Sequence, residues 1–537
     1  MKDLAKAVVL AGLLLTCGGW RSGSGGADVT TQYMDNGRTG WNQRESILSP
    51  EGVRSSGFGT ICSRTDLDGE IDGQPLHLRQ STVTGLTADT IYVGTGNNTV
   101  YALNARTCAT ITSVNLGTAV DGSHVSGGGC ETNPPGSSMG IRPTMVIDLT
   151  LKTLFVLAAV WDGANVKHYM HALDLVTLAD KVSAAQVSGS APISGGGTYT
   201  FDAGVSHPRA GLVFAGGNVY AAYGSYCDFG ADLTRGWLFG WDGATLAPLV
   251  HNELTNTAVR NSPDNYYLTS IWQAGQSPAA DSSGSVYFVT GNGGGYAAAP
   301  GPPDANTNTV MKVSGDLATV QTSFTPYQEL LFDQFDQDLG SSGITLLPDN
   351  SGPNPHLALV NGKQGGMYVL DRDSMGGFVA GGPDAVLSNI NIGAGSACAQ
   401  HYFEGADGNP RLLTCAGGGG SNYQSIWTLD TSVNPPTITI EHADIANGLV
   451  NGGSALNGVA SYLHTKHTIW LIDRPCRSCS VNVNTLAFDA SGNHLKTMAS
   501  GTWDVLDNLM SVSPVVASGR VIIASNGKLY VFGMVPR

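Results

Sequence analysis

Residues 89–104 read DTIYVGTGNNTVYALN, and this stretch contains the pattern that decides the fold. Two runs rich in β-branched and aromatic residues flank the turn residues GTGNN, which predicts two strands joined by a tight turn. The second run ends on Asn104, a residue type that favours turns. Variants of this strand ending recur along the whole chain.

The ending consists of an aromatic or aliphatic residue, a small or apolar one, another apolar one, and then Asp or a turn residue. Its copies are YALN (101–104), HALD (171–174), FGWD (239–242), MKVS (311–314), YVLD (368–371), WTLD (427–430), LAFD (486–489) and YVFG (530–533). Most copies follow another short strand, and further upstream lies an apolar run such as GQPLHL or SPVVASG. Three or four strands per unit, repeated eight times, predict an all-β fold: a single eight-bladed β-propeller of four-stranded antiparallel blades.

The last copy has no fourth strand after it, so closing the ring requires a strand from elsewhere. FGTICSRTD (58–66) is the N-terminal run that we expect to supply it. A β-sandwich or a two-domain β protein is the structural alternative, but neither predicts eight similar strand endings.

The composition agrees with a turn-rich all-β chain. Of 537 residues, 42% are hydrophobic and only 13% are charged, while there are 72 glycines and 24 prolines. The net charge is −15 and no basic run occurs, which argues against nucleic acid and anionic membrane surfaces as partners.

The N-terminus resembles an export signal. Lys2 and Lys6 precede an apolar run over residues 7–15, too short to span a bilayer. Leu-Leu-Thr-Cys17 resembles a bacterial lipobox, with plain signal-peptidase cleavage as the alternative. We expect a signal peptide at 1–17, a Gly/Ser-rich linker at 18–28 and the propeller at 29–537, in a periplasmic, extracellular or lipid-anchored protein.

Eight cysteines remain after Cys17, an even number that favours disulfides in an exported chain. The candidate pairs are Cys62 with Cys108, Cys130 with Cys227, Cys398 with Cys415, and Cys476 with Cys479. Because Ser480 rather than His follows the last cysteine, a c-type haem attachment site is absent.

Three carboxylates are concentrated in FDQFDQDLG (332–340), which is unusual in so charge-poor a chain. They are Asp333, Asp336 and Asp338. Two explanations are open for this cluster. The three aspartates could be ordinary exposed turn residues, or they could belong to a site that binds a cation or accepts a proton. Asp333 is expected to be a loop residue.

The surrounding stretches resemble a known family, the quinoprotein alcohol dehydrogenase-like propellers. They are GSYCDFGADLTRGWLFGWD (224–242), WQAGQSPAADSSGSVYFVTGN (272–292), TPYQELLFDQFDQDLG (325–340) and NGKQGGMYVLDRDSMG (361–376). As repeat architecture the resemblance spans roughly residues 30–537. It implies pyrroloquinoline quinone (PQQ) as cofactor and oxidation of an alcohol or sugar hydroxyl, with electrons passed to an external acceptor.

The resemblance also implies roles for individual residues. PQQ is a flat, electron-poor tricarboxylate that needs an aromatic floor, cationic contacts and a Lewis acid. Trp272 would be the floor, and Lys363 would contact the quinone oxygens. Asp228 and Asn292 would be ligands of Ca²⁺, and Asp336 would be the general base.

Asp338 fits the spacing of family members that use lanthanides, which carry a second Asp two residues after the base. It is therefore a candidate additional metal ligand. The chain departs from the family in having no adjacent cysteine pair, and Phe335 stands where a Trp usually precedes the base.

Two alternatives to the dehydrogenase remain open. The chain would be a non-catalytic binding or assembly-scaffold propeller that has lost the cofactor, or a propeller enzyme that processes polysaccharides. Taken one at a time, these residues have ordinary interpretations. Trp272 could be a core aromatic, Lys363 a surface cation, and Asn292-Gly293 a tight turn. Their joint occurrence in family order favours the dehydrogenase.

Overall fold

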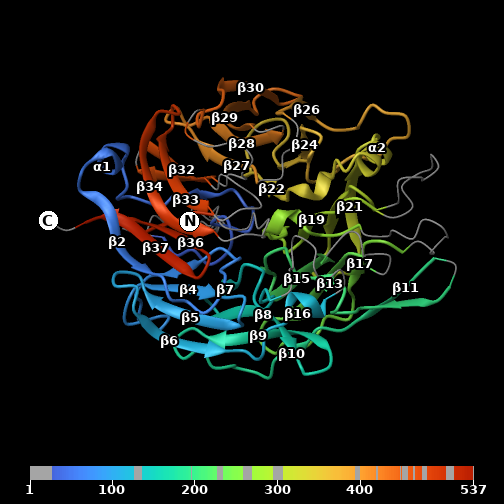
Figure 1. Cartoon of the computed structure of the whole chain (residues 1–537). Helices are drawn as coiled ribbons and strands as arrows, with labels where there is room; N and C mark the ends of the chain where they lie inside the picture. Colours follow the sequence, from blue (N-terminus) through green and yellow to red (C-terminus); the bar gives the residue numbers. More distant parts are fainter. Residues whose placement is uncertain are drawn as a thin grey trace, which may run out of the picture.

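Eight small antiparallel sheets follow one another around a central axis, so the predicted eight-bladed propeller is confirmed (Figure 1). This computed structural model describes residues 27–125, 136–194, 196–226, 234–257, 269–293, 306–393, 399–418, 421–447, 449, 458–463, 466–473, 481–503 and 513–535. No helix within these ranges is long and apolar enough to cross a membrane.

The first four blades follow the chain from the N-terminal side. Their strands are β3 (Leu76–Leu78), β4 (Thr90–Gly94), β5 (Thr99–Asn104) and β6 (Thr110–Asn115) in blade 1; β7 (Val146–Asp148), β8 (Thr153–Trp161), β9 (Val166–Asp174) and β10 (Ala185–Gln186) in blade 2; β14 (Val213–Ala215), β15 (Asn218–Ser225), β16 (Trp237–Asp242) and β17 (Glu253–Leu254) in blade 3; and β18 (Ala279–Ala280), β19 (Val286–Val289), β20 (Val310–Val313) and β21 (Val320–Thr325) in blade 4.

The other four blades complete the ring. Their strands are β22 (Ile344–Leu346), β23 (Leu357–Asn361), β24 (Gly366–Asp371) and β26 (Ser388–Asn391) in blade 5; β27 (His401–Glu404), β28 (Pro410–Gly418), β29 (Ser421–Asp430) and β30 (Thr437–His442) in blade 6; β31 (Gly458–Leu463), β32 (Lys466–Asp473), β33 (Val481–Asp489) and β34 (His494–Trp503) in blade 7; and β35 (Val515–Ala517), β36 (Arg520–Ser525), β37 (Lys528–Met534) and β2 (Phe58–Arg64) in blade 8.

Short elements decorate these blades. They are β1 (Trp41–Asn42), α1 (Pro50–Arg54), η1 (Gly122–His124), the projecting hairpin of β11 (Ser190–Pro192) and β12 (Thr198–Thr200), β13 (Ser206–His207), η3 (Gln273–Gly275), α2 (Glu329–Gln334), η4 (Leu339–Ser341) and β25 (Gly377–Phe378).

The eight repeated strand endings all fall in the third strand of their blades. Their last residue shapes the turn to the fourth strand. Thr107 N–H donates to Asn104 Oδ1 at 3.1 Å, and Thr177 and Thr245 N–H donate to Asp174 and Asp242 at 2.9 Å. An Asx side chain that accepts from the backbone two or three residues later is a common turn device, which explains why six of the eight copies end on Asp or Asn.

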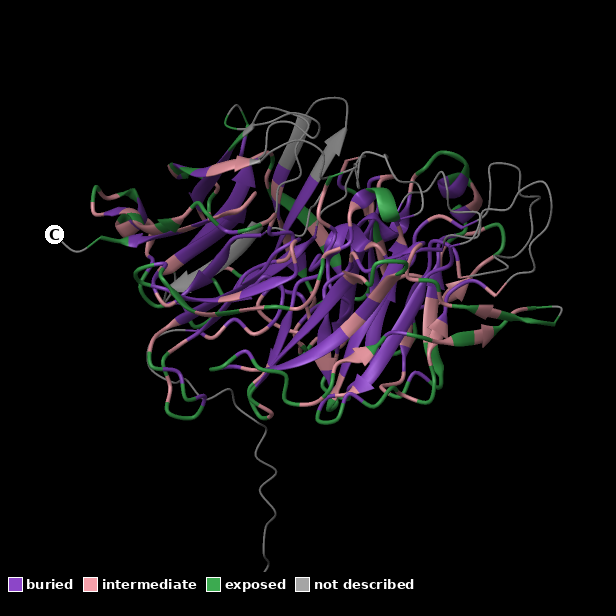
Figure 2. Cartoon of the chain, turned by 60° about the horizontal axis from the view of Figure 1, so that its bottom comes forward, coloured by how far each residue is buried: buried purple, intermediate pink, exposed green. Residues whose placement is uncertain are grey.

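The hydrophobic core lies between neighbouring blades. One buried cluster joins Leu76 and Tyr92 of blade 1 to Val156 of blade 2, and another joins Val531 of blade 8 to Ile91 of blade 1. Figure 2 shows buried residues running along the strands, with exposed residues mostly in the connections. Each blade therefore buries its faces mainly against its neighbours, as repeat architectures require.

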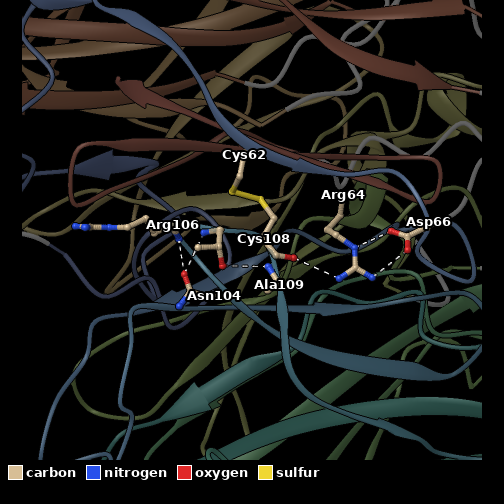
Figure 3. Close-up of a disulfide and its surroundings, with 8 residues drawn as sticks. Cys62, Arg64, Asp66, Asn104, Arg106, Cys108 and Ala109 are labelled. Carbon is tan, nitrogen blue, oxygen red and sulfur yellow. Dashed lines mark hydrogen bonds and ion pairs between the residues drawn. A yellow bond between two sulfur atoms is a disulfide. The ribbon is translucent and has the colours of Figure 1, made fainter. Parts of the chain in front are cut away.

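The ring closes as predicted through residues 58–66. Strand β2 pairs antiparallel with β37, from Phe58 opposite Met534 to Arg64 opposite Leu529. A Cys62–Cys108 disulfide, with Cα atoms 5.7 Å apart, then ties this closing strand to blade 1 (Figure 3). Arg64 adds a second link, because its guanidinium donates to Thr110 Oγ1 at 2.9 Å.

Of the four predicted disulfides, Cys62–Cys108 is confirmed. Cys415 is disulfide-bonded, while its predicted partner Cys398 lies outside the described residues. The remaining cysteines also lie outside the described residues, namely Cys130, Cys227, Cys476 and Cys479.

The segment from Val29 to Asn42 contacts the first strand of every blade in turn. Its hydrogen bonds run to β3 from Val29, β7 from Thr30, β14 and β18 from Asn36, β22 from Gly37, β27 from Thr39, β31 from β1, and β35 from Asn42. A single segment can meet all eight innermost strands only from inside the ring, so it occupies the centre of the propeller.

Candidate functional site

The candidate residues lie at equivalent positions of blades 4 and 5. Trp272 precedes the first strand of blade 4, and Asn292 follows its second strand. Asp336 and Asp338 precede the first strand of blade 5, and Lys363 follows its second strand. Because first and second strands are antiparallel, the start of one and the end of the other lie at the same rim.

Lys363 is the centre of the group. Its ammonium donates to Asp336 Oδ1 at 2.7 Å and to Asp338 Oδ2 at 2.6 Å, and its backbone N–H donates to the Asp338 carbonyl at 3.0 Å. Burial acts to lower the pKa of Lys363, but the two carboxylates outweigh it and raise this pKa. The ammonium therefore stays charged.

Asp338 is the buried carboxylate of the pair, with 7% of its side chain exposed. Its Oδ1 accepts the backbone N–H of Asn292 at 2.7 Å, while Oδ2 accepts from Lys363. Burial tends to raise the pKa of Asp338, but the Lys363 charge and these hydrogen bonds bring it below its usual range. Asp338 is held as a carboxylate.

Asp336 is the accessible carboxylate, with 64% of its side chain exposed. Its backbone has a positive φ of 52°, which turns the chain sharply between α2 and η4. Asn292 Nδ2 donates to its Oδ1 at 3.1 Å. Partial burial raises the pKa of Asp336, as does the neighbouring Asp338 charge, while Lys363 acts in the opposite direction. A raised pKa and an accessible oxygen suit a proton acceptor.

Two cations lie close to the ring of Trp272. The Lys363 ammonium lies 5.4 Å and the Arg209 guanidinium 5.1 Å from the centroid of its ring. Glycine is required at position 291, since a Cβ there would lie 2.7 Å from Trp272 Nε1 and 2.6 Å from Asp338 Oδ1. The ring and the buried carboxylate thus meet across a residue that has no side chain.

The segment inside the ring supports the turn that carries Trp272. Gln32 Nε2 donates to the carbonyl of Gly275 at 3.2 Å, and Gln32 Oε1 accepts from the backbone and hydroxyl of Ser277. The position of the aromatic ring therefore depends on the centre of the propeller as well as on blade 4.

The structure brings together five of the six predicted site residues: Trp272, Asn292, Asp336, Asp338 and Lys363. Asp228, the sixth, lies outside the described residues. Within the described ranges, no three His, Cys, Asp or Glu side chains gather closely enough to hold a metal ion. Of the predicted metal ligands, Asn292 and Asp338 belong to the described part of the site.

One prediction about FDQFDQDLG was wrong. Asp333 does not lie in a loop but in α2, where it is 9% exposed. The helix begins after Pro326, whose carbonyl accepts the N–H of Glu329, and it buries Phe332. Because this helix is partly buried, Asp333 contacts Asn308 and Gly293 instead of solvent.

Sequence reasoning also missed Arg209 and Asn308. Arg209 lies one blade away from Trp272, and only the ring geometry brings the two together. Asn308 had a usable signal, because Asn308-Thr309-Val310 repeats Asn98-Thr99-Val100 of the opening stretch.

Comparisons with known proteins agree on the fold. No protein-family model and no curated protein sequence matches the chain. Among solved structures, it resembles quinohemoprotein alcohol dehydrogenases from Comamonas testosteroni (TM-score 0.59, 14% identity, 95% of this chain and 81% of that one) and Pseudomonas putida (0.55, 13%, 95% and 80%). It also resembles a europium-containing methanol dehydrogenase (0.56, 13%, 94% and 98%). At such identities the likeness establishes the shared propeller fold.

Proposed function

We propose that this chain, which shares the eight-bladed fold of quinoprotein alcohol and methanol dehydrogenases, is an exported dehydrogenase that oxidises an alcohol or sugar hydroxyl with PQQ and a metal ion. The observation that carries the proposal is the convergence of Asp336, Asp338 and Lys363 beside Trp272. These residues are separated along the chain, but they lie at one rim of two adjacent blades.

The residues present fit PQQ. A planar, polyanionic ring system needs an aromatic surface flanked by cations, and Trp272 has both Lys363 and Arg209 within 5.4 Å of its ring centroid. Because residue 291 is glycine, no side chain separates the indole edge of Trp272 from Asp338. Trp272 would support the ring system, and the two cations would bind its oxygen atoms.

The metal ion would be held by hard oxygen donors. Asn292 supplies such an oxygen, and Asp228 would join it as a ligand of Ca²⁺. Lys363 now neutralises both carboxylates, so a cation at Asp336 and Asp338 would have to displace its ammonium. A lanthanide, which would recruit Asp338 as well, is the weaker option.

The protein's own part in the reaction would be proton transfer and positioning. When bound, PQQ would supply an electron-poor quinone that accepts hydride equivalents. Asp336 would accept the proton of the substrate hydroxyl at its carboxylate, which is accessible and has a raised pKa. Asp338 would keep Lys363 charged and in place. Electrons would leave to an external acceptor.

Reconstitution tests the proposal. Purified protein is incubated with PQQ plus Ca²⁺ or La³⁺ and assayed for dye reduction against a panel of alcohols and sugars. We expect cofactor absorbance that survives desalting and dye reduction that Asp336→Asn abolishes. Asp316→Asn, in an exposed turn of blade 4, is the matched control and should retain activity.

The alternative is a binding or assembly scaffold without cofactor. The chain has no adjacent cysteine pair of the kind that covers the cofactor in family alcohol dehydrogenases. Wild-type protein that retains no PQQ and reduces no dye with either metal would refute the dehydrogenase and support this alternative.

A further inference from the structure

Asn308 is a fully buried side chain that joins the two halves of the candidate site. It immediately precedes Thr309 and strand β20, is 0% exposed, and has a positive φ of 48°. The general base, the metal donors and the aromatic floor proposed above do not include it. Its contacts nevertheless all lead to their neighbours.

The side chain of Asn308 makes three hydrogen bonds. Its Oδ1 accepts the backbone N–H of Leu339, the residue after Asp338, at 2.9 Å. Its Nδ2 donates to Asp333 Oδ1 at 2.7 Å and lies 3.4 Å from Asn292 Oδ1. Its backbone N–H donates to the Gly291 carbonyl at 3.0 Å. One residue thus links the segment after β19 to the segment between α2 and η4.

Asp333 strengthens this link from the helix side. The same oxygen that accepts from Asn308 also accepts the backbone N–H of Gly293 at 3.2 Å. The two residues therefore contact Asn292 and its neighbour. Asp333 accepts from Gly293, the residue after Asn292, and Asn308 contacts the side chain of Asn292 itself. A buried polar network whose members are satisfied rigidifies its surroundings.

The repeat offers an internal comparison for Asn308. Asn98 occupies the same place in blade 1: it is 0% exposed, has a φ of 62°, and is followed by Thr99 and Val100. The backbone bonds match, because Thr95 N–H donates to the Thr99 carbonyl and Thr290 N–H to the Thr309 carbonyl, both at 2.9 Å.

The two asparagines differ in the groups that their side chains contact. Asn98 Nδ2 donates to the Ala159 carbonyl of blade 2 at 2.7 Å, so it ties one blade to the next. Asn308 also reaches the next blade, but its partners there are Leu339 and Asp333, on either side of Asp336 and Asp338. The asparagine that links one blade to the next in blade 1 therefore recurs in blade 4, where its contacts lie at the candidate site.

We propose that Asn308 and Asp333 form a positioning pair that sets the orientation of Asn292 and Asp338, and through Asp338 that of Lys363. This inference rests on the proposed function in naming those residues as reactive groups, but the geometry can be tested without it. Neither Asn308 nor Asp333 touches the proposed substrate; both act through their neighbours.

The test uses hydrogen exchange at two amides that neither residue of the pair contacts. The N–H of Asn292 donates to Asp338 Oδ1, and the N–H of Lys363 donates to the Asp338 carbonyl. Asn308→Gly removes the side chain without straining the positive φ. Asp333→Ala removes the acceptor, whereas Asp333→Asn keeps an Oδ1 that can accept both bonds. Asn98→Gly is the matched control in blade 1.

We expect exchange at both amides to accelerate by roughly fivefold to tenfold in Asn308→Gly and Asp333→Ala, the order expected when the closed state loses the net contribution of about one hydrogen bond. Asp333→Asn and Asn98→Gly should retain wild-type exchange at these two amides. If Asn308→Gly does not fold, the comparison of Asp333→Ala with Asp333→Asn provides the test. Wild-type exchange in the folded Ala or Gly variant, or equal acceleration in Asn98→Gly, would overturn the inference.

Dye-linked kinetics then separate this inference from the proposed function. If the wild type is active, Asn308→Gly should lower kcat by roughly tenfold with little change in KM, as for misplaced reacting groups. An unchanged kcat would overturn the positioning role. If the wild type is inactive, the dehydrogenase proposal fails, while the exchange data still decide whether the pair orients Asp338.

Discussion

Two aspartates separated by one residue have different surroundings, and the difference has a chemical consequence. Asp338 is buried and accepts hydrogen bonds from Asn292 and Lys363. Asp336, in a positive-φ conformation, keeps most of its side chain in solvent. Their pKa values consequently move in opposite directions, downward for Asp338 and upward for Asp336. Such a divergence is common where one carboxylate orients and its neighbour transfers a proton.

Asp338→Asn tests this division of labour through pH dependence. Asp338 raises the pKa of Asp336 by its charge and also shares Lys363 with it. Removing that charge favours the ionised form of Asp336, so its pKa should fall. The acidic limb of kcat/KM should move to lower pH by about one unit, the scale of a lost neighbouring charge.

This measurement is a pH profile of dye reduction, with Asp316→Asn as the control. Asn at position 338 can still accept the N–H of Asn292, which limits structural damage. An acidic limb that stays in place or moves to higher pH would contradict the assignment of Asp336 as the base.

At the scale of elements, the segment over Val29–Asn42 contributes something that no blade supplies. It bonds to the first strand of all eight blades, and Arg38 is its main internal anchor. The guanidinium donates to the Pro278 carbonyl at 2.9 and 2.7 Å and to Thr31 Oγ1 at 2.6 Å. Because Gln32 of the same segment supports the turn after Trp272, the anchor also affects the site.

Arg38→Met should therefore be strongly destabilising. The change leaves buried acceptors without their donors, including the Pro278 carbonyl, and a loss of about 3 kcal/mol or more in the free energy of unfolding is expected. Denaturant unfolding measures it. Arg106→Met, at an exposed turn position, is the control and should change stability by less than about 0.5 kcal/mol. Equal stabilities of the two variants would show that Arg38 is not an anchor.

The whole molecule depends on joining its last blade to its first. Strand β2 completes blade 8, and the Cys62–Cys108 disulfide fastens this strand to blade 1 across a separation of 46 residues. Each blade buries its faces against its neighbours, so an open ring would expose two such faces at once. The disulfide therefore stabilises the closed ring as a unit.

Replacing both cysteines of this bridge by serine should lower the free energy of unfolding by about 2–4 kcal/mol, the range for a native disulfide. Denaturant unfolding of the oxidised protein measures the loss. The double alanine variant controls for the buried hydroxyl at Cys108, and should lose a similar amount. Wild-type stability in both double variants would mean that strand pairing alone closes the ring.

Much of the fold could be predicted because its signals are local and repeated. The third strand of every blade and the closing strand at 58–66 follow from short patterns, and the Cys62–Cys108 pair was one of the candidate pairings that an even number of cysteines suggested. The helix around Asp333 could not be predicted, since six residues without a strong cap carry little helical signal. Arg209 escaped notice because its relation to Trp272 exists only across two blades.

The sequence by itself determined the propeller and its number of blades, because periodic burial and turn chemistry act between near neighbours along the chain. The five candidate residues that converge were indicated by the resemblance to a known family. Only the tertiary structure decided which carboxylate is buried, which cations flank Trp272, and that Asn308 joins Asn292 to the segment of Asp338. Burial and charge at this site depend on residues that the packing of neighbouring blades brings together, and no local pattern in the sequence records them.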